Sequence, residues 1–279
     1  MKRAFVIGHP IAHSKSPLLH GHWLEEHKID GSYQALDVDP ADLSKFVQDL
    51  KAGALVGGNV TVPHKETVMA LCDRLTDTAK KIGAVNTLWL QDGQLFGDNS
   101  DKYGFLANLD QQLPNWDAQK ETALVLGAGG AARAILVGLA ERRYKKILVL
   151  NRTLERAAAL CDQLNIAFSS DHFSAAKLST FNELVQNSDL IVNTSAVGMG
   201  GTKFDNIDLA RAPKHAIVSD IVYTPLETPL LVDAKQASLR TVDGVGMLLH
   251  QAVLGFERWF GVRPEVSDEL RKKILGEKT

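Results

Sequence analysis

The chain has 279 residues, 45% of them hydrophobic, with 31 basic and 33 acidic side chains and a formal net charge of −2. This length and apolar content suit a folded protein with two domains of ordinary size. Because the charge is so nearly balanced, we expect no nucleic-acid or membrane partner, and a small molecule becomes the expected one. Two distant cysteines, Cys72 and Cys161, exclude a disulfide framework and favour a reducing compartment.

Two apolar stretches bear on the location of the protein. The N-terminal run 4–8 is too short for the core of a signal peptide. The stretch 123–140 has the length of a membrane span, but its glycine cluster and Arg133 suit a turn between a strand and a helix better. We therefore expect a cytoplasmic protein.

The pattern of apolar residues predicts alternating strands and helices, which favours an α/β fold with a mostly parallel sheet. In chain order, the pattern predicts strands at 4–8, 33–38, 54–62 and 84–90, and helices at 17–28, 40–51 and 64–82. The rhythm restarts near residue 121 with strands at 122–127, 146–150, 190–193 and 216–220, and helices from about 130 and 153. A long amphipathic helix is predicted at 244–261.

A glycine-rich turn follows the strand at 122–127. Gly127, Gly129 and Ala132 form a GxGxxA pattern that opens a helix. The first glycine permits a tight turn, the second lets a pyrophosphate approach the backbone, and the small third residue allows close packing. In this context a dinucleotide site is the favoured interpretation, and a purely structural turn is the alternative.

The next strand ends without the acidic residue that usually binds the adenosine ribose. Asn151, Arg152 and Thr153 stand there instead, and Arg156 follows one turn later. Positive charge at this place suits a 2′-phosphate, so NADP fits better than NAD. The alternative is an ordinary pair of surface arginines at the start of a helix.

Lys65 is the least expected residue of the segment 57–72. The segment reads as a strand followed by a helix with Pro63 in its first turn, which places Lys65 at a helix N-terminus. A cation there faces the positive end of the helix dipole, at a cost of about 0.3–1 kcal/mol. The sequence offers no local reason to accept this cost.

Other polar clusters allow ordinary structural interpretations. Ser14 and Ser16 could hold a carboxylate if the segment is extended, or one of them could cap a helix. The acidic cluster 98–101 is typical of a turn or a helix cap. Gln251 borders the apolar stripe of the last long helix, as a solvated flanking residue would. The four histidines of the N-terminal region do not have the spacing of a helical metal site, so we expect no metal.

Taken in order, nine motifs of the chain resemble those of the shikimate dehydrogenase family over nearly its whole length. They are GHPIAHSKSP, GNVTVPHK, GAVNT, DNSD, GAGGAARA, NRTLERA, NTSAVGM, DIVYTPLETPLL and GVGMLLHQA. The resemblance implies NADPH-dependent reversible reduction of 3-dehydroshikimate to shikimate, in chorismate and aromatic amino-acid biosynthesis. It also implies an N-terminal α/β substrate domain, 1–103, completed by the C-terminal helices, 240–279, and a Rossmann-type NADP domain, 104–239. The protein would be a monomer or a homodimer.

Site residues carried over from the family fall into three groups. Lys65 and Asp101 match the catalytic pair. The expected substrate-binding residues are Ser14, Ser16, Asn59, Thr61, Asn86, Tyr223 and Gln251. The expected cofactor-binding residues are Gly127, Ala128, Gly129, Gly130, Ala131, Asn151, Arg152, Thr153, Arg156, Thr194, Met199, Gly244 and Met247.

The resemblance supplies a reason for Lys65. A cationic donor beside the substrate ketone would stabilise the developing alkoxide and supply its proton, with Asp101 holding the ammonium in place. Two positions depart from the family pattern: Lys102 replaces a glycine beside Asp101, and Gly21 replaces an asparagine. The first adds a positive charge beside Asp101 and removes a glycine from the local turn.

Two other functions remain open. A quinate/shikimate dehydrogenase-type paralogue would accept NAD or a substrate with an extra hydroxyl group, and the arginines at 152 and 156 argue against it. A nicotinamide-nucleotide sensor that binds without turnover would need neither Lys65 nor Asp101.

Overall fold

The computed structural model describes residues 1–53 and 55–277, and it divides the chain into two compact units. Unit 1 comprises Met1–Gly104 and Leu249–Thr279, and unit 2 comprises Phe105–Leu248. Residue 54, the first of a predicted strand, lies outside the described residues. The helices α4 (Asp101–Gln112) and α9 (Val245–Phe260) each have their first turns in one unit and their remainder in the other.

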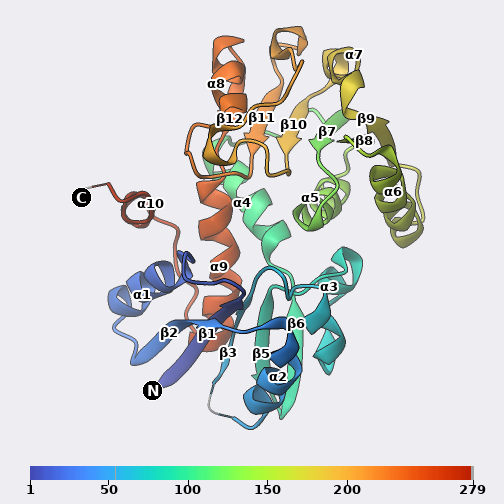
Figure 1. Cartoon of the computed structure of the whole chain (residues 1–279). Helices are drawn as coiled ribbons and strands as arrows, with labels where there is room; N and C mark the ends of the chain where they lie inside the picture. Colours follow the sequence, from blue (N-terminus) through green and yellow to red (C-terminus); the bar gives the residue numbers. More distant parts are fainter. Residues whose placement is uncertain (54, 278–279) are drawn as a thin grey trace. The chain divides into compact units, whose positions relative to one another are not determined.

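Unit 1 is built on a sheet with the strand order β2-β1-β3-β5-β6-β4, drawn in blue to blue-green in Figure 1. The strands β1, β2 and β3 are parallel, whereas β5 runs antiparallel to both β3 and β6. Its elements are β1 (Lys2–Gly8), α1 (Ser16–Glu26), β2 (Gly31–Asp37), η1 (Pro40–Asp42), α2 (Leu43–Lys51), β3 (Gly57–Val60), η2 (Thr67–Leu71), β4 (Arg74–Leu75), α3 (Asp77–Ile82), β5 (Thr87–Gln91), β6 (Gln94–Asp98) and α10 (Asp268–Leu275).

The last long helix packs closely on the middle of this sheet. Trp259 of α9 donates its indole N–H to the backbone oxygen of Leu88 on β5, 2.8 Å away. Gly57 on β3 has φ +149°, and a Cβ atom there would stand 2.5 Å from the Trp259 nitrogen. Glycine is therefore required both by the backbone and by the close approach of the indole. This contact holds the C-terminal helix against the N-terminal strands, although about 170 residues separate them in sequence.

The prediction of one continuous helix at 64–82 is wrong. Val62–Glu66 forms turns, and the short 3₁₀ helix η2, the strand β4 and the helix α3 follow in its place. The ring of His64 is buried, and its Nε2 donates a hydrogen bond to the backbone oxygen of Val38, 2.8 Å away. This tertiary contact of a polar side chain holds the segment as a turn, so local helix propensity does not decide its structure.

Unit 2 has a parallel sheet with the strand order β12-β11-β10-β7-β8-β9, which is the doubly wound order of a dinucleotide-binding fold. Helices surround this sheet in the green-to-orange part of Figure 1. Its elements are β7 (Thr122–Leu126), α5 (Gly130–Glu141), β8 (Lys146–Asn151), α6 (Leu154–Phe168), β9 (Phe173–Lys177), η3 (Leu178–Thr180), α7 (Phe181–Leu184), η4 (Val185–Asn187), β10 (Leu190–Asn193), η5 (Met199–Gly201), η6 (Leu209–Arg211), β11 (Ile217–Asp220), α8 (Pro229–Gln236) and β12 (Arg240–Val242).

The order of this sheet changes direction between β7 and β10, which both continue into loops at their carboxyl ends. Ligands of open parallel sheets bind at such a switch point. Within the described residues, no helix is long and apolar enough to cross a membrane.

Candidate active site

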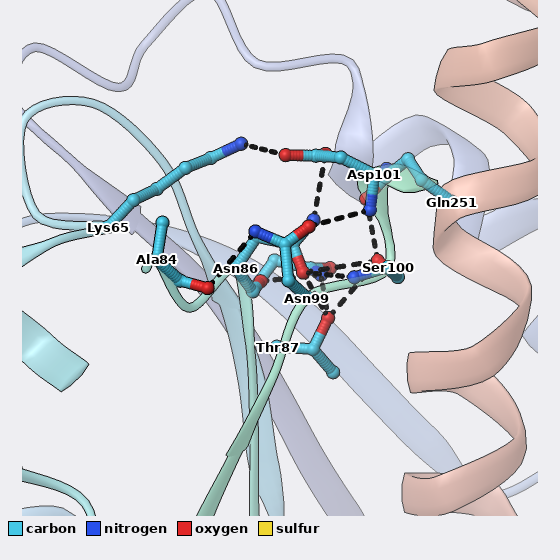
Figure 2. Close-up of polar contacts among 9 residues, drawn as sticks. Lys65, Ala84, Asn86, Thr87, Asn99, Ser100, Asp101 and Gln251 are labelled. Carbon is cyan, nitrogen blue, oxygen red and sulfur yellow. Dashed lines mark hydrogen bonds and ion pairs between the residues drawn. The ribbon is translucent and has the colours of Figure 1, made fainter. Parts of the chain in front are cut away.

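Lys65, which follows β3, and Asp101, which follows β6, form an ion pair in unit 1. The ammonium nitrogen of Lys65 lies 2.6 Å from Oδ2 of Asp101, and Figure 2 shows the two side chains reaching toward one another. The side chain of Lys65 is 28% exposed and that of Asp101 is 13% exposed. Lys65 lies in the turn that precedes η2, so the predicted helix N-terminus at this residue is wrong. No helix dipole opposes its charge, because a 3₁₀ helix of five residues provides none of consequence.

Asp101 is the first residue of α4, and the side chain of Asn99, two residues earlier, binds its backbone. Oδ1 of Asn99 accepts a hydrogen bond from the backbone N–H of Asp101, 3.0 Å away. The amide nitrogen of Asn99 donates in turn to the backbone oxygen of Ala84, at 3.1 Å. The cluster 98–101 thus behaves as a helix start, one of the two ordinary interpretations from the sequence, and it also delivers the carboxylate of Asp101 to Lys65.

Asn86 is the central residue of a buried polar network in Figure 2. Its Nδ2 donates to Oδ1 of Asp101 at 2.8 Å. Its Oδ1 accepts hydrogen bonds from the backbone N–H of Ser100 and from the hydroxyl group of Thr87, both at 2.8 Å. The carboxylate of Asp101 therefore has two fixed partners, an ammonium and an amide, and its orientation is set before any substrate arrives.

Gln251 points from α9 toward this network in Figure 2. Its Oε1 lies 3.5 Å from the hydroxyl oxygen of Ser100, which is the donor. Gln251 is half-buried, and its role as a substrate-binding residue stays a prediction. Asn59 on β3 also joins the network, because its Nδ2 donates to the backbone oxygen of Asn86 at 3.1 Å.

The two departures from the family pattern have simple structural accounts. Lys102 donates a hydrogen bond to the hydroxyl group of Thr78 on α3, 3.3 Å away. It follows Asp101 in α4, and α4 forms without a glycine at this position. At Gly21, a Cβ atom would meet no heavy atom within 4 Å, so a larger side chain is sterically allowed there.

Ser14 and Ser16 lie at the start of α1, where the segment is not extended. Lys15 between them has helical dihedral angles, and Oγ of Ser14 accepts a hydrogen bond from the backbone N–H of Ser16 at 3.3 Å. The sequence argument for a carboxylate site required an extended backbone from Ser14 to Ser16. The backbone is not extended there, so this requirement is not met. Thr61 follows β3 and accepts a backbone hydrogen bond from His64, and Tyr223 belongs to unit 2, where it is 37% exposed.

The glycine-rich turn of unit 2 has the geometry of a pyrophosphate cradle. Gly127 has φ +110°, and a Cβ atom there would lie 3.0 Å from the hydroxyl oxygen of Thr194. Ala128, Gly129, Gly130 and Ala131 continue the turn into α5, and a Cβ atom at Gly129 or Gly130 would meet nothing within 4 Å. The start of α5 therefore has open space where a phosphate group can approach the backbone, so these residues fit a dinucleotide.

Two cationic side chains follow the end of β8, one in the turn and one in the first turns of α6. Arg152 and Arg156 are exposed and form no ion pair among residues 1–53 and 55–277. Asn151 donates its side-chain N–H to the backbone oxygen of Thr153 at 2.8 Å, which closes the turn into α6. This edge of the unit fits an additional phosphate group, as predicted from the sequence.

Of the remaining predicted cofactor residues, Met199 is 57% exposed and Met247 is buried. A Cβ atom at Gly244 would lie 2.4 Å from the backbone oxygen of Ile221, so only glycine fits at this position. All three belong to unit 2.

Asp220 is a buried polar residue that sequence reasoning missed. It ends β11 and accepts hydrogen bonds from Asn193 at 2.8 Å, from the hydroxyl group of Thr228 at 2.6 Å and from the N–H of Val222 at 2.9 Å. Burial raises the pKa of its carboxyl group to about 6, and these three hydrogen bonds act in the opposite direction. The signal available in the sequence was an acidic residue at the end of an apolar strand.

The N-terminal histidines lie in different surroundings. His9 pairs with Asp37, with 2.6 Å between Nδ1 and the carboxylate, and this hydrogen bond raises its pKa. His20 is completely buried among aromatic rings. In the part of the chain that the structure describes, no cluster of three or more His, Cys, Asp or Glu residues could hold a metal ion.

The strand order and the glycine-rich turn of unit 2 are those of a dinucleotide-binding fold, and unit 1 adds a Lys–Asp ion pair, as expected for a nucleotide-dependent oxidoreductase. Family models match three parts of the chain. They are the shikimate dehydrogenase substrate binding domain over residues 6–88, shikimate/quinate 5-dehydrogenase over 108–243 and the shikimate 5′-dehydrogenase C-terminal domain over 244–268. The chain belongs to the shikimate dehydrogenase family.

Two curated relatives carry the name shikimate dehydrogenase (NADP(+)). The one from Mesorhizobium japonicum is 52% identical over 276 residues, covering 99% of this chain and 96% of the relative. The one from Brucella abortus strain S19 is 51% identical over 279 residues, covering 99% and 94%. The family and the enzyme class predicted from the sequence are confirmed.

Two solved structures show the same fold over 99% of both chains. Shikimate 5-dehydrogenase from Thermus thermophilus, in complex with NADP(H) and shikimate, has a TM-score of 0.86 and 35% identity. Quinate dehydrogenase from Corynebacterium glutamicum, in complex with NAD, has a TM-score of 0.90 and 28% identity. The predicted fold class is confirmed.

Proposed function

We propose that the chain catalyses the reversible, NADPH-dependent reduction of 3-dehydroshikimate to shikimate, with Lys65 and Asp101 as its catalytic pair. Membership of the shikimate dehydrogenase family and the names of the curated relatives support this reaction and NADP as the cofactor. The observation that carries the assignment of the pair is the 2.6 Å contact between the Lys65 ammonium and the Asp101 carboxylate.

The cofactor, when bound, supplies the hydride of the reduction. Lys65 then has two tasks, since its ammonium stabilises the negative charge that develops on the ketone oxygen and donates the proton that completes the alcohol. Asp101 keeps the ammonium in place and balances its charge. Asn86 holds Oδ1 of Asp101, so that the carboxylate is not free to turn away from Lys65.

We assign substrate binding to unit 1 and nucleotide binding to unit 2. The substrate carboxylate is held by the hydroxyl groups at the start of α1, and the ring hydroxyl groups by the amides of the polar network. The unit 1 residues of this set are Ser14, Ser16, Asn59, Thr61, Asn86 and Gln251, and a substrate-binding role of Tyr223 in unit 2 stays a prediction from the sequence. The cofactor set is Gly127, Ala128, Gly129, Gly130, Ala131, Asn151, Arg152, Thr153, Arg156, Thr194, Met199, Gly244 and Met247.

A quinate/shikimate dehydrogenase-type activity is the second candidate. One family model bears the name shikimate/quinate 5-dehydrogenase, and the quinate dehydrogenase from Corynebacterium glutamicum has the same fold. Arg152 and Arg156, which form no ion pair with any described residue, favour NADP and therefore the first candidate. A nucleotide sensor without turnover has no need of the Lys65–Asp101 pair.

The deciding experiment follows the absorbance of the reduced nicotinamide. The purified protein is offered shikimate and then quinate, each with NADP and with NAD. We expect rapid turnover only in the mixture of shikimate and NADP. Absence of turnover in all four mixtures would favour the nucleotide sensor. A cytoplasmic location and a monomeric or homodimeric state stay predictions.

A further inference from the structure

The hydroxyl group of Tyr33 reaches Asn59 across the intervening strand. Tyr33 on β2 lies in register with Ala4 of β1, and Asn59 on β3 lies in register with Val6. Since Ala4 and Val6 are two residues apart, all four side chains leave the same face of the sheet. The small side chain of Ala4 leaves room for the Tyr33 ring, whose hydroxyl group donates to Oδ1 of Asn59 at 2.6 Å.

The orientation of the Asn59 amide is set from both sides. Its Nδ2 donates to the backbone oxygen of Asn86 at 3.1 Å, and a backbone oxygen can only accept. The Oδ1 of Asn59 must therefore face Tyr33, which must donate. Burial raises the pKa of Tyr33 well above its ordinary value, with Asn59 and Ser16 acting in the opposite direction, so this hydroxyl group keeps its proton.

His20 fixes the ring that carries this hydroxyl group. The imidazole stacks on the Tyr33 ring with 4.0 Å between centroids and 17° between planes, and Phe256 stacks at 5.9 Å. His20 is completely buried, and burial lowers its pKa to about 3, with Asn59 acting in the opposite direction. A charged imidazole would be destabilised among these apolar side chains, so His20 is neutral. Its ring packs against the Tyr33 ring as an aromatic side chain would.

Asn59 connects Tyr33 to the catalytic pair. Asn59 donates to the backbone oxygen of Asn86, and Nδ2 of Asn86 donates to Oδ1 of Asp101. Oδ2 of Asp101 in turn accepts from the ammonium of Lys65. Asn59 is only 5% exposed, and its amide makes hydrogen bonds with both of its polar atoms. Within the described residues, the second N–H of Asn59 has one further contact, a long one of 3.5 Å to the hydroxyl oxygen of Thr87, and this N–H is the group left for a ligand.

We infer that Tyr33 is a positioning residue for substrate recognition, which acts by holding the Asn59 amide so that its remaining N–H donor faces a ring hydroxyl group of the substrate. This inference rests on the proposed function. Tyr33 has no direct part in proton transfer, so it should affect binding of the substrate rather than the chemical step.

The test is the substitution Tyr33→Phe, which keeps the stacked ring and removes only the hydroxyl group. We expect the KM for shikimate to rise about tenfold, kcat to change less than about threefold, and the KM for NADP to stay unchanged. The matched control is Tyr144→Phe in unit 2. Tyr144 is also buried, but its hydroxyl group has no hydrogen-bond partner in the described ranges, so its removal should leave the KM for shikimate unchanged.

A double-mutant cycle separates positioning from general stability. In an Asn59→Ala background, Tyr33→Phe should raise the KM no further, because the group it positions is absent. Calorimetric titration with shikimate replaces KM where turnover of this background is too slow. An equal rise in both backgrounds, or a KM of Tyr33→Phe equal to that of the wild type, would overturn the inference. Failure of the wild type to oxidise shikimate would instead reject the proposed function.

Discussion

The ammonium of Lys65 contacts the carboxylate of Asp101 at 2.6 Å, although the two residues are 36 positions apart. If this pair moves the proton, Lys65→Ala should lower kcat by about 10²–10⁴-fold with a much smaller change in KM. Steady-state kinetics with shikimate and NADP measure both. The matched control is Lys51→Ala, which breaks another Lys–Asp pair of unit 1, at 2.7 Å to Asp73, away from the network. A kcat unchanged in Lys65→Ala would refute the assignment.

Ser14 and Ser16 provide a test of the carboxylate site. Replacing either by alanine should weaken shikimate binding by about 1.5–3 kcal/mol, the usual contribution of a hydrogen bond to a charged group. Binding of NADP should not change. Calorimetric titration with each ligand checks this, with Ser44→Ala as the control, an exposed serine on α2. Parallel losses for both ligands would indicate misfolding rather than a carboxylate site.

Arg152 should decide between the two nicotinamide cofactors. Losing about two charge-assisted hydrogen bonds to a 2′-phosphate predicts a preference for NADP of about 10²–10⁴ in kcat/KM. Arg152→Asp should lower this value for NADP and leave it equal or higher for NAD, because the carboxylate repels phosphate and accepts from ribose hydroxyl groups.

Kinetics with both cofactors test this prediction. The control is Arg143→Asp, which makes the same change of charge at an exposed residue before β8, whereas Arg152 follows that strand. A wild-type preference below about tenfold would leave Arg152 and Arg156 as surface arginines only, and the quinate-type activity would gain support.

The carboxyl group of Asp220 should make unit 2 less stable as the pH rises. Its pKa is about 6 in the fold, above the ordinary value of 3.8, because burial disfavours the charged form. The folded state therefore binds the proton more tightly than the unfolded state, and the stabilisation present below about pH 4 is lost as the pH rises to about 6. The total loss is about 3 kcal/mol, from about two pKa units.

The substitution Asp220→Asn should remove this dependence. Its side-chain oxygen can still accept from Asn193 and Val222, and its amide can donate to Thr228. Urea unfolding of both proteins across this pH range gives the difference in the free energy of unfolding, with Asp233→Asn as an exposed control on α8. A difference that does not vary with pH would contradict the prediction.

The sequence by itself determined the α/β class, the nucleotide unit and the family. Most long elements follow their apolar pattern: β10 begins and ends at the predicted residues, and α9 differs from the predicted helix by one residue at each end. The turn at Gly127 was readable because a positive φ and a close backbone approach require glycine, and such a requirement is local.

Tertiary structure decided which polar residues meet. No periodicity joins Lys65 to Asp101 or Tyr33 to Asn59, since each contact bridges separate elements. The helix predicted at Lys65 failed for the same reason: the buried ring of His64 is bound to Val38, and this contact outweighs local propensity. Spacing in a sequence fixes which side chains share an element, whereas hydrogen bonds between elements depend on how the sheet and its helices pack, and packing brings distant residues together.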